Sequence, residues 1–400
     1  MARRRLLPGA DARQGLVALA LNSSTSLVAG AVLGSLTPTF ERRPGLLVLV
    51  PAAIGLRGNV FGSLGNRVST AIHAGELQLR LRRTTMLGQN VLAAGALTLG
   101  MSLVLVGVAA LVSVGLGLGP TIGLADLALV SIGGGAVASL PVLAATLGLA
   151  SGAVRFGWDL DNVTAPLVST FGDVLTLPAL YLATGLLGIG VVSSGLGWVL
   201  AVVAVAALVA GIRSPLAQLR DIVRTSIPVL VMAGLVSSLA GVALERRLVT
   251  FMALPALLIL VPAHLSSAGA LGGILSGRLS SQLLLGLAPP TAVPSRAARR
   301  DLWFVGGLSL PVFVVNGAGA HLVASVLGVA SPGLVPLIGA SVLGGLTAML
   351  VVVLIAYYGT IATVRLGIDP DTYGIPMVSS SVDLVGALTL IIAIAVLGLT

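Results

Sequence analysis

Apolar stretches of 18 or more residues recur from one end of the chain to the other, and this feature limits the possible folds most strongly. A stretch of that length is enough for a helix to cross a bilayer. Charged residues make up only 9% of the 400 residues, whereas a soluble domain carries about 25%. The sequence therefore predicts an all-α polytopic membrane protein that is surrounded by membrane lipids.

Hydropathy predicts about eleven transmembrane helices in this sequence. Their approximate bounds are 14–38, 44–75, 84–117, 122–153, 162–184, 186–212, 225–244, 251–283, 302–328, 333–362 and 373–399. A straight helix of about 32 residues would be ~48 Å long, against a hydrocarbon core of roughly 30 Å. The spans 44–75 and 251–283 are therefore predicted to be tilted, kinked or broken near their central prolines and glycines.

The arginines predict which end of the molecule faces the cytoplasm, because short cytoplasmic loops are enriched in basic residues. If the N-terminus is cytoplasmic, the cytoplasmic loops contain Arg3, Arg4, Arg5, Arg13, Arg80, Arg82, Arg83, Arg155, Arg213, Arg220, Arg224, Arg296, Arg299, Arg300 and Arg365. The outer loops contain Arg42, Arg43, Arg246 and Arg247. We therefore expect a protein of the plasma membrane with its N-terminus in the cytoplasm and its C-terminus outside.

Composition excludes several other classes of function. The absence of cysteine excludes disulfides, thiolate metal sites and cysteine catalysis. The +9 net charge comes from arginines between apolar spans, so membrane topology explains it and no nucleic-acid partner is predicted. The three histidines share no metal-ligand spacing, and no serine–histidine pair is apparent at membrane depth, so we do not expect an enzyme.

The chain contains an internal repeat. Shifting it by 211 residues lays "PAAIGLRGNVFGSLGNRVS" at 51–69 on "PAHLSSAGALGGILSGRLS" at 262–280, with seven of nineteen positions identical. These identities include Pro51 with Pro262 and Gly58 with Gly269, and Gly30 falls on Gly241 at the same shift. The match indicates two copies of one structural unit.

A shift of 210 residues lays "WDLDNVTAPLVSTFGDVLTL" at 158–177 on "IDPDTYGIPMVSSSVDLVGA" at 368–387. Six of twenty positions match. They include three aspartate pairs, Asp159 with Asp369, Asp161 with Asp371 and Asp173 with Asp383. Small apolar alphabets produce chance identities easily, but three aligned aspartates from only 13 acidic residues indicate a duplication.

Each copy holds five spans, and one additional span separates them. We predict one repeat at 1–184, a linking transmembrane helix and cytoplasmic loop at 185–224, and a second repeat at 225–400. The interval of six spans gives both copies the same orientation. The repeats should therefore be parallel and related by a pseudo-twofold axis along the membrane normal.

Asp173 is the most informative residue, because it lies in the middle of an apolar span. It lies twelve residues after Asp161, about 18 Å deeper in a core roughly 30 Å thick. A carboxylate at that depth costs about 2.5–3.5 kcal/mol on insertion scales. The repeat places Asp383 at the same depth, and two such carboxylates would repel unless a cation or proton lies between them. Mg²⁺ is a suitable counter-ion, since it needs only one or two carboxylates and keeps several waters.

Each of these aspartates also has a structural interpretation. Asp173 could hydrogen-bond to serine, threonine or backbone groups within the bundle. Asp159, Asp161, Asp369 and Asp371 could form a cytoplasmic entrance that concentrates cations, or could cap the N-termini of their helices. Both interpretations remain open at the level of the sequence.

The second predicted span carries further polar residues in the stretch "GLRGN". Asn59 could ligate or hydrate an ion through its amide oxygen, or could instead hydrogen-bond between helices. Gly58 and its repeat partner Gly269 are predicted to support a pore. Arg57 is expected to extend its side chain to the membrane surface.

These motifs resemble the MgtE family of magnesium transporters. "PAAIGLRGNVFGSLGNRVSTA" is similar to its Pro…Gly-Asn…Arg element, and "DLDNVTAPLVSTFGD" and "DPDTYGIPMVSSSVD" are similar to its Asp-Pro-Asp…Pro…Asp element. The layout is closest to the duplicated solute-carrier type and its archaeal relatives. The resemblance covers both halves, which is most of the chain outside 186–224.

The resemblance implies roles for individual residues. In this family the fifth helices of two five-helix domains supply a carboxylate pair to a Mg²⁺ path, a role that falls here on Asp173 and Asp383. It also implies a backbone oxygen near the ion about one turn earlier, at Ser169 and Ser379. Because one chain holds both halves, a monomer would supply a whole pore.

The sequence departs from the family pattern at three points. Ala270 occupies the position equivalent to Asn59, and Leu160 replaces the proline that the second copy has at Pro370. Bacterial members also carry a large cytoplasmic region with CBS domains, whereas only a short segment precedes the first span here. We therefore expect regulation without CBS domains.

Together these features predict a transporter or channel for a divalent cation, most consistent with Mg²⁺. The alternative is a permease or exchanger for another cation or solute, which would use the same aspartates to couple transport to Na⁺ or H⁺. Neither the direction of transport nor selectivity against Mn²⁺ and Co²⁺ is encoded in these motifs.

Overall fold

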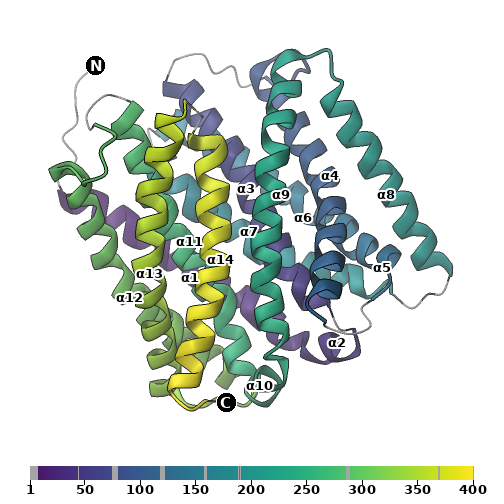
Figure 1. The fold of residues 1–400 in the computed structure, drawn as a ribbon, viewed down its shortest axis with the longest axis vertical. Coiled ribbons are helices and arrows are strands. Elements are labelled where there is room, and N and C mark those ends of the chain that lie inside the picture. The colour runs from purple at the N-terminus through teal and green to yellow at the C-terminus, as the bar shows by residue number, and fades with distance from the viewer. Residues whose placement is uncertain are drawn as a thin grey trace.

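The computed structural model describes residues 8–43, 45–73, 80–117, 122–156, 160–187, 189, 191–284, 289–367 and 370–399. Every secondary-structure element in these ranges is a helix (Figure 1). The helices are α1 Pro8–Ser35, α2 Thr37–Arg42, α3 Leu46–His73, α4 Met86–Gly115, α5 Leu124–Ala128, the π-helix η1 Leu129–Gly134, α6 Gly135–Phe156, α7 Leu160–Thr184, α8 Val191–Ile212, α9 Ala217–Glu245, α10 Leu248–Ala253, α11 Pro255–Leu284, α12 Arg296–Leu327, α13 Leu334–Arg365 and α14 Pro370–Val396.

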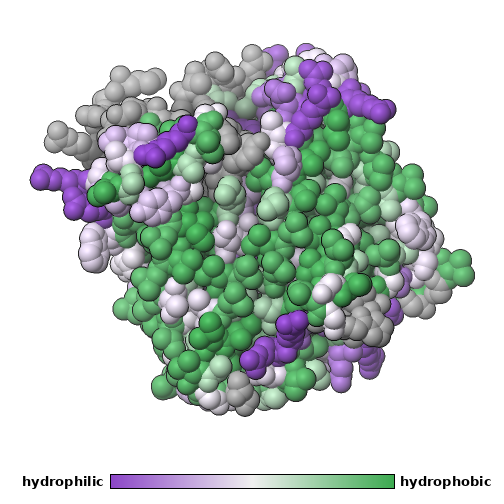
Figure 2. Space-filling view, in the orientation of Figure 1, coloured by the Kyte–Doolittle hydropathy of each residue, from purple (hydrophilic) through white to green (hydrophobic). Residues whose placement is uncertain are grey.

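The helices confirm the prediction of an all-α polytopic membrane protein. Within the described residues, ten helical segments are long and apolar enough to cross a membrane. The remaining predicted span, 162–184, coincides with α7. Apolar residues cover the middle of the face shown in Figure 2, and hydrophilic residues gather toward its two ends. This distribution is typical of a helical bundle surrounded by lipid.

Both long predicted spans are helical through their central prolines, although the span 251–283 begins in α10, which ends at Ala253 before α11 starts at Pro255. α3 continues through Pro51 and α11 continues through Pro262, so a break in either helix, one of the expected outcomes, does not occur. Both helices are buried along most of their length, whereas α8 lies at the edge of the bundle and is largely exposed (Figure 1). The centre of the molecule is therefore built from α3 and α11.

The halves of the chain pack across each other with matching contacts. α1 packs against α11 of the other half, and α9 packs in the same way against α3. Gly30 on α1 meets the backbone of Ile259, and Gly241 on α9 meets the backbone of Val48. Both pairs are related by the shift of 211 residues. Because a side chain would overlap a carbonyl oxygen at either glycine, only glycine permits these helix crossings.

A second pair of matching contacts joins η1 to α4 in the first half and α13 to α12 in the second half. Ser131 Oγ donates to Ser102 O across 2.8 Å, and Ser341 Oγ donates to Phe313 O across 2.7 Å. The surrounding helices nevertheless differ, because the first half contains the π-helix η1 whereas the second half has the continuous α13. A π-helical turn is common at functional sites and accommodates an irregular backbone.

Candidate functional site

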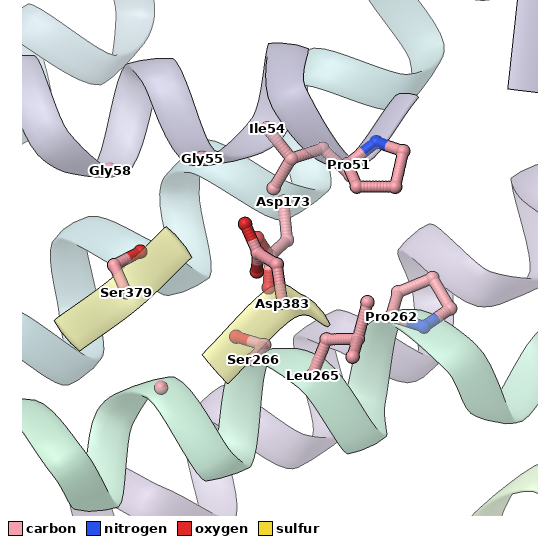
Figure 3. Close-up of a pocket in the computed structure, with 11 residues that line it drawn as sticks. Pro51, Ile54, Gly55, Gly58, Asp173, Pro262, Leu265, Ser266, Ser379 and Asp383 are labelled. Atoms are coloured by element: carbon pink, nitrogen blue, oxygen red, sulfur yellow. The ribbon is translucent and has the colours of Figure 1, made fainter. Parts of the chain in front are cut away.

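The candidate site is a small cavity in the centre of the bundle, where α3, α7, α11 and α14 meet. Its volume is about 60 Å³, which is enough for ordered water if polar groups are available. Figure 3 shows the side chains of Asp173 and Asp383 together in this space, with Pro51 and Pro262 beside them. The two aspartates that the repeat predicted to be equivalent therefore line one cavity.

Asp173 enters the cavity from the middle of α7 and is only 2% exposed. Its Oδ2 accepts a hydrogen bond of 2.8 Å from Ser26 Oγ on α1. Ser266 on α11, which also lines the cavity, is a second hydrogen-bond partner of this carboxylate. These hydroxyls partly compensate the loss of hydration that burial imposes on a carboxylate.

Asp383 enters the same cavity from the middle of α14 and is half-buried. Its Oδ2 accepts a hydrogen bond of 2.6 Å from Ser237 Oγ on α9. Ser237 lies 211 residues after Ser26, so each carboxylate is held by an equivalent serine on the first helix of its own half. Sequence reasoning missed this serine pair, although the shift that aligned Gly30 with Gly241 also aligned it.

Glycines keep the cavity open on both sides of the carboxylates. Gly58 on α3 and Gly269 on α11, the two glycines related by the shift of 211 residues, both line it. Among the described residues, no heavy atom other than neighbouring backbone lies within 4 Å of where a Cβ would stand at either glycine. Side chains at these positions would therefore point into free space within the cavity.

Some predicted site residues fall outside the described part of the structure. Asp159 and Asp369 lie in undescribed segments, and the side chains of Ser169, Asp161 and Asp371 are likewise not described. The backbone of Asp161 lies in the first turn of α7, and that of Asp371 lies in the first turn of α14. Ser379 is described and lines the cavity one turn before Asp383.

Two polar residues of α3 lie away from the cavity. Asn59 is buried and borders a smaller pocket between α3, α4 and α9, where its Oδ1 has no partner among the described groups. Arg57 is 1% exposed and donates to Ala53 O, Ser102 Oγ and Ser131 O. The expectation that Arg57 reaches the membrane surface is therefore wrong. The π-helix supplies one of its acceptors, a feature with no recognisable sequence signal.

The described side chains that line the cavity offer oxygen atoms as ligands. It presents two carboxylates and the serine hydroxyls beside them, and none of the described residues that line it has a nitrogen or sulfur side chain. Within the described residues, no group of three or more His, Cys, Asp or Glu is present that could form a larger metal cluster. Oxygen ligands with few carboxylates suit hard divalent cations that retain water.

Comparison with known proteins identifies the family. The family model of MgtE, described as a divalent cation transporter, matches residues 50–183 and 261–393. The chain belongs to the MgtE family. One matched segment lies within each of the two predicted copies, and each segment contains one of the cavity aspartates. The chain thus carries two MgtE-like segments, and ten helices of its described part are long and apolar enough to cross a membrane.

Animal solute carriers are similar to part of this MgtE-family chain. It is 29% identical over 178 residues to solute carrier family 41 member 3 of Rattus norvegicus, which covers 42% of this chain and 37% of that protein. It is 30% identical over 178 residues to member 2 of Xenopus laevis, with 43% and 31% covered. The chain thus matches about a third of the length of these relatives. No solved structure matches it.

Proposed function

We propose that the chain transports Mg²⁺ across the plasma membrane through the cavity between its halves, with Asp173 and Asp383 binding the ion. The observation that carries this proposal is that both carboxylates line one cavity in the centre of the bundle, each held by an equivalent serine. Two ionised carboxylates supply the charge that balances one divalent cation. Without a cation they would repel each other at a depth where charge is costly.

The size and polarity of the cavity favour a partly hydrated ion. Mg²⁺ is reluctant to lose its waters and is commonly bound through one or two carboxylates. A cavity of about 60 Å³ leaves room for water beside the two carboxylates. Ser379, one turn before Asp383, and Ser169, at the equivalent position of α7, are proposed to contribute further oxygen ligands.

The path to the site is proposed to start in the cytoplasm. Asp159, Asp161, Asp369 and Asp371 would form its entrance, at the end of the molecule where α7 and α14 begin. Gly58 and Gly269 would keep the cavity wide enough for a hydrated ion, and Asn59 would support α3 beside it. In this orientation the N-terminus is cytoplasmic and the C-terminus is outside.

The two repeats, 1–184 and 225–400, are proposed to contribute one half of the pathway each, with 185–224 as the link. Support comes from the matching crossings of α1 with α11 and of α9 with α3. Because the carboxylates of both halves belong to one chain, a monomer would hold a complete site. Transport would then need no second copy.

Flux measurements in proteoliposomes test this function. We expect Mg²⁺ uptake by the purified full chain, and we expect it to fall to background in Asp173→Ala and in Asp383→Ala. Asp221→Ala, a substitution of an exposed aspartate on α9, is the matched control and should retain the flux. Unchanged flux in both cavity variants would contradict the site. Dependence of the flux on an imposed Na⁺ or H⁺ gradient would instead favour a coupled exchanger that uses the same aspartates.

A further inference from the structure

The two carboxylates of the cavity have different polar surroundings. Asp173 has two hydroxyl partners, Ser26 at 2.8 Å and Ser266. Asp383 accepts a bond of 2.6 Å from Ser237, the equivalent of Ser26. The residue equivalent to Ser266 is Gly55, at the shift of 211 residues, and glycine has no hydroxyl to offer. Each aspartate therefore has one of two equivalent serines as a partner, Ser26 or Ser237. Only Asp173 has the additional partner Ser266.

A buried polar cluster holds Ser266 in place beside Asp173. Asn22 Oδ1 on α1 accepts a hydrogen bond of 3.0 Å from Thr170 Oγ1, and it lies 3.0 Å from Ser266 Oγ, whose single proton is shared between Asn22 and Asp173. Asn22 is completely buried, so these bonds are sheltered from competing water. In the second half the residue equivalent to Asn22 is Ala233. The Asp383 side therefore lacks the residue that anchors the cluster.

Gly55 leaves one face of Asp383 open. A Cβ added at Gly55 would stand 3.1 Å from Asp383 Oδ2 and 3.5 Å from Ser237 Oγ. Any side chain at this position would therefore touch the carboxylate. With glycine there, Asp383 is half-buried and faces the cavity, whereas Asp173 is only 2% exposed.

We propose that Ser266 and Gly55 give the two aspartates different roles. Asp383 ligates the cation directly, and Asp173 binds it through coordinated water. This inference rests on the proposed function of the cavity. Ser26 donates to Asp173, and Ser266 shares its one proton between Asp173 and Asn22, so both hydroxyls compete with a metal ion for the lone pairs of Asp173. Asp383 has more free lone pairs and more room. Mg²⁺ accommodates this division, because it keeps several waters while it takes one carboxylate.

The first test compares matched aspartate variants of the full chain in proteoliposomes. We expect Asp383→Asn to raise the Mg²⁺ concentration for half-maximal flux about tenfold more than Asp173→Asn does, the difference expected from one charge-assisted contact. A Mg²⁺-dependent rise in Tm in detergent reports binding for variants that transport too slowly. Equal effects of the two substitutions in both measurements would overturn the proposed division.

The second test moves the hydroxyl from one aspartate to the other. In the double variant Ser266→Gly/Gly55→Ser, we expect the order to reverse, with Asp173→Asn now the more harmful change. Gly55→Ala narrows the space beside Asp383 without adding a hydroxyl, so it should reduce the difference between the two aspartates without reversing their order. An unchanged order in the double variant would overturn the inference. No response of the natural chain to Mg²⁺ in flux or Tm would overturn the proposed function as well, so the two failures are distinguishable.

Discussion

The two halves of this chain share contacts that position their helices at the cavity, and they differ in the polar groups around them. Each half holds its cavity aspartate with a serine from its first helix. Each also crosses the other half at a glycine, Gly30 or Gly241. The duplicated sequence has therefore kept the contacts that position the helices at the cavity. Side chains that do not determine these positions have diverged.

The surroundings of two equivalent glycines illustrate this divergence. Gly135 and Gly345 are related by the shift of 210 residues, and both leave space for a large side chain from a neighbouring helix. At Gly135 this side chain is Arg57 from α3, whereas at Gly345 it is Phe313 from α12. The space beside the equivalent glycine thus holds a guanidinium group in one half and an aromatic ring in the other.

A partly buried ion pair joins α11 and α12 in the second half. Arg278 on α11 lies 3.0 Å from Asp301 on α12, which also accepts a bond of 2.5 Å from Gln282. The guanidinium of Arg278 stacks over Phe304, 4.4 Å from the centre of its ring. In the first half Asp301 is replaced by Asn90. The α11–α12 contact therefore depends on charge at a position where the α3–α4 contact has a neutral amide.

The largest effect is expected where the halves are most alike. Gly30→Ala and Gly241→Ala would each place a methyl group on a carbonyl oxygen of the opposing helix. Overpacking commonly costs about 1–3 kcal/mol, and a backbone obstacle cannot move aside as a side chain can, so we expect about 3 kcal/mol or more in both. Gly107→Ala on α4, which meets open space, is the control. Unfolding in detergent measures the loss, and a clearly smaller cost in one half would break the equivalence.

The next largest loss of unfolding free energy is expected on substitution of Arg57, which lies in the first half. Arg57→Ala should cost about 2–3 kcal/mol in unfolding free energy, because it empties a buried volume next to Gly135. Arg57→Met refills most of that volume without charge, and it should cost less, since burying a cation is itself unfavourable. If Arg57→Met is as harmful as Arg57→Ala, the hydrogen bonds to Ser102 and Ser131 matter more than packing.

A smaller effect is expected at the ion pair of the second half. Asp301→Asn removes the charge while it keeps the shape of the side chain, and it installs the residue that the first half has at Asn90. Charge-assisted hydrogen bonds contribute about 1.5–3 kcal/mol, and partial exposure of Arg278 places the expected loss near 1.5 kcal/mol. The Tm in detergent should fall accordingly. An unchanged Tm would show that the pair adds nothing beyond packing.

The smallest effects should again be equal in the two halves. Ser131→Ala and Ser341→Ala each remove one hydroxyl that bonds to a carbonyl oxygen of the neighbouring helix. Interhelical hydrogen bonds in membranes contribute about 0.6 kcal/mol on average. We expect losses of that order in unfolding free energy, and similar values for both serines. A large excess at Ser131 would indicate that the π-helix depends on this bond.

Much of this fold could be predicted from hydropathy and from the internal repeat. Apolar length determines where helices cross a bilayer, and each predicted span has a helix at its place. The pairing of Asp173 with Asp383 was visible because charged residues are rare in this chain, so their alignment stands out. Gly58 and Gly269 were recognised through the shift of 211 residues, together with Pro51 and Pro262.

Other features of the site depend on side-chain neighbours that the sequence does not reveal. Ser26 and Ser237 align at the same shift, but serine is common in this chain and carries little signal there. Arg57 was expected at the membrane surface because long basic side chains usually reach it. Its acceptors lie on α4 and η1, and neither their proximity nor the π-helical turn can be inferred from periodicity.

The most direct test of a cation site between the halves is the position of a bound metal. Mn²⁺ accepts the same oxygen ligands as Mg²⁺ and scatters anomalously, so crystals of the natural chain grown with Mn²⁺ can reveal it. We predict one anomalous peak in the central cavity between Asp173 and Asp383, and its loss in the double variant Asp173→Asn/Asp383→Asn. A peak elsewhere in the bundle, or an empty cavity in a Mn²⁺-saturated crystal, would contradict the account.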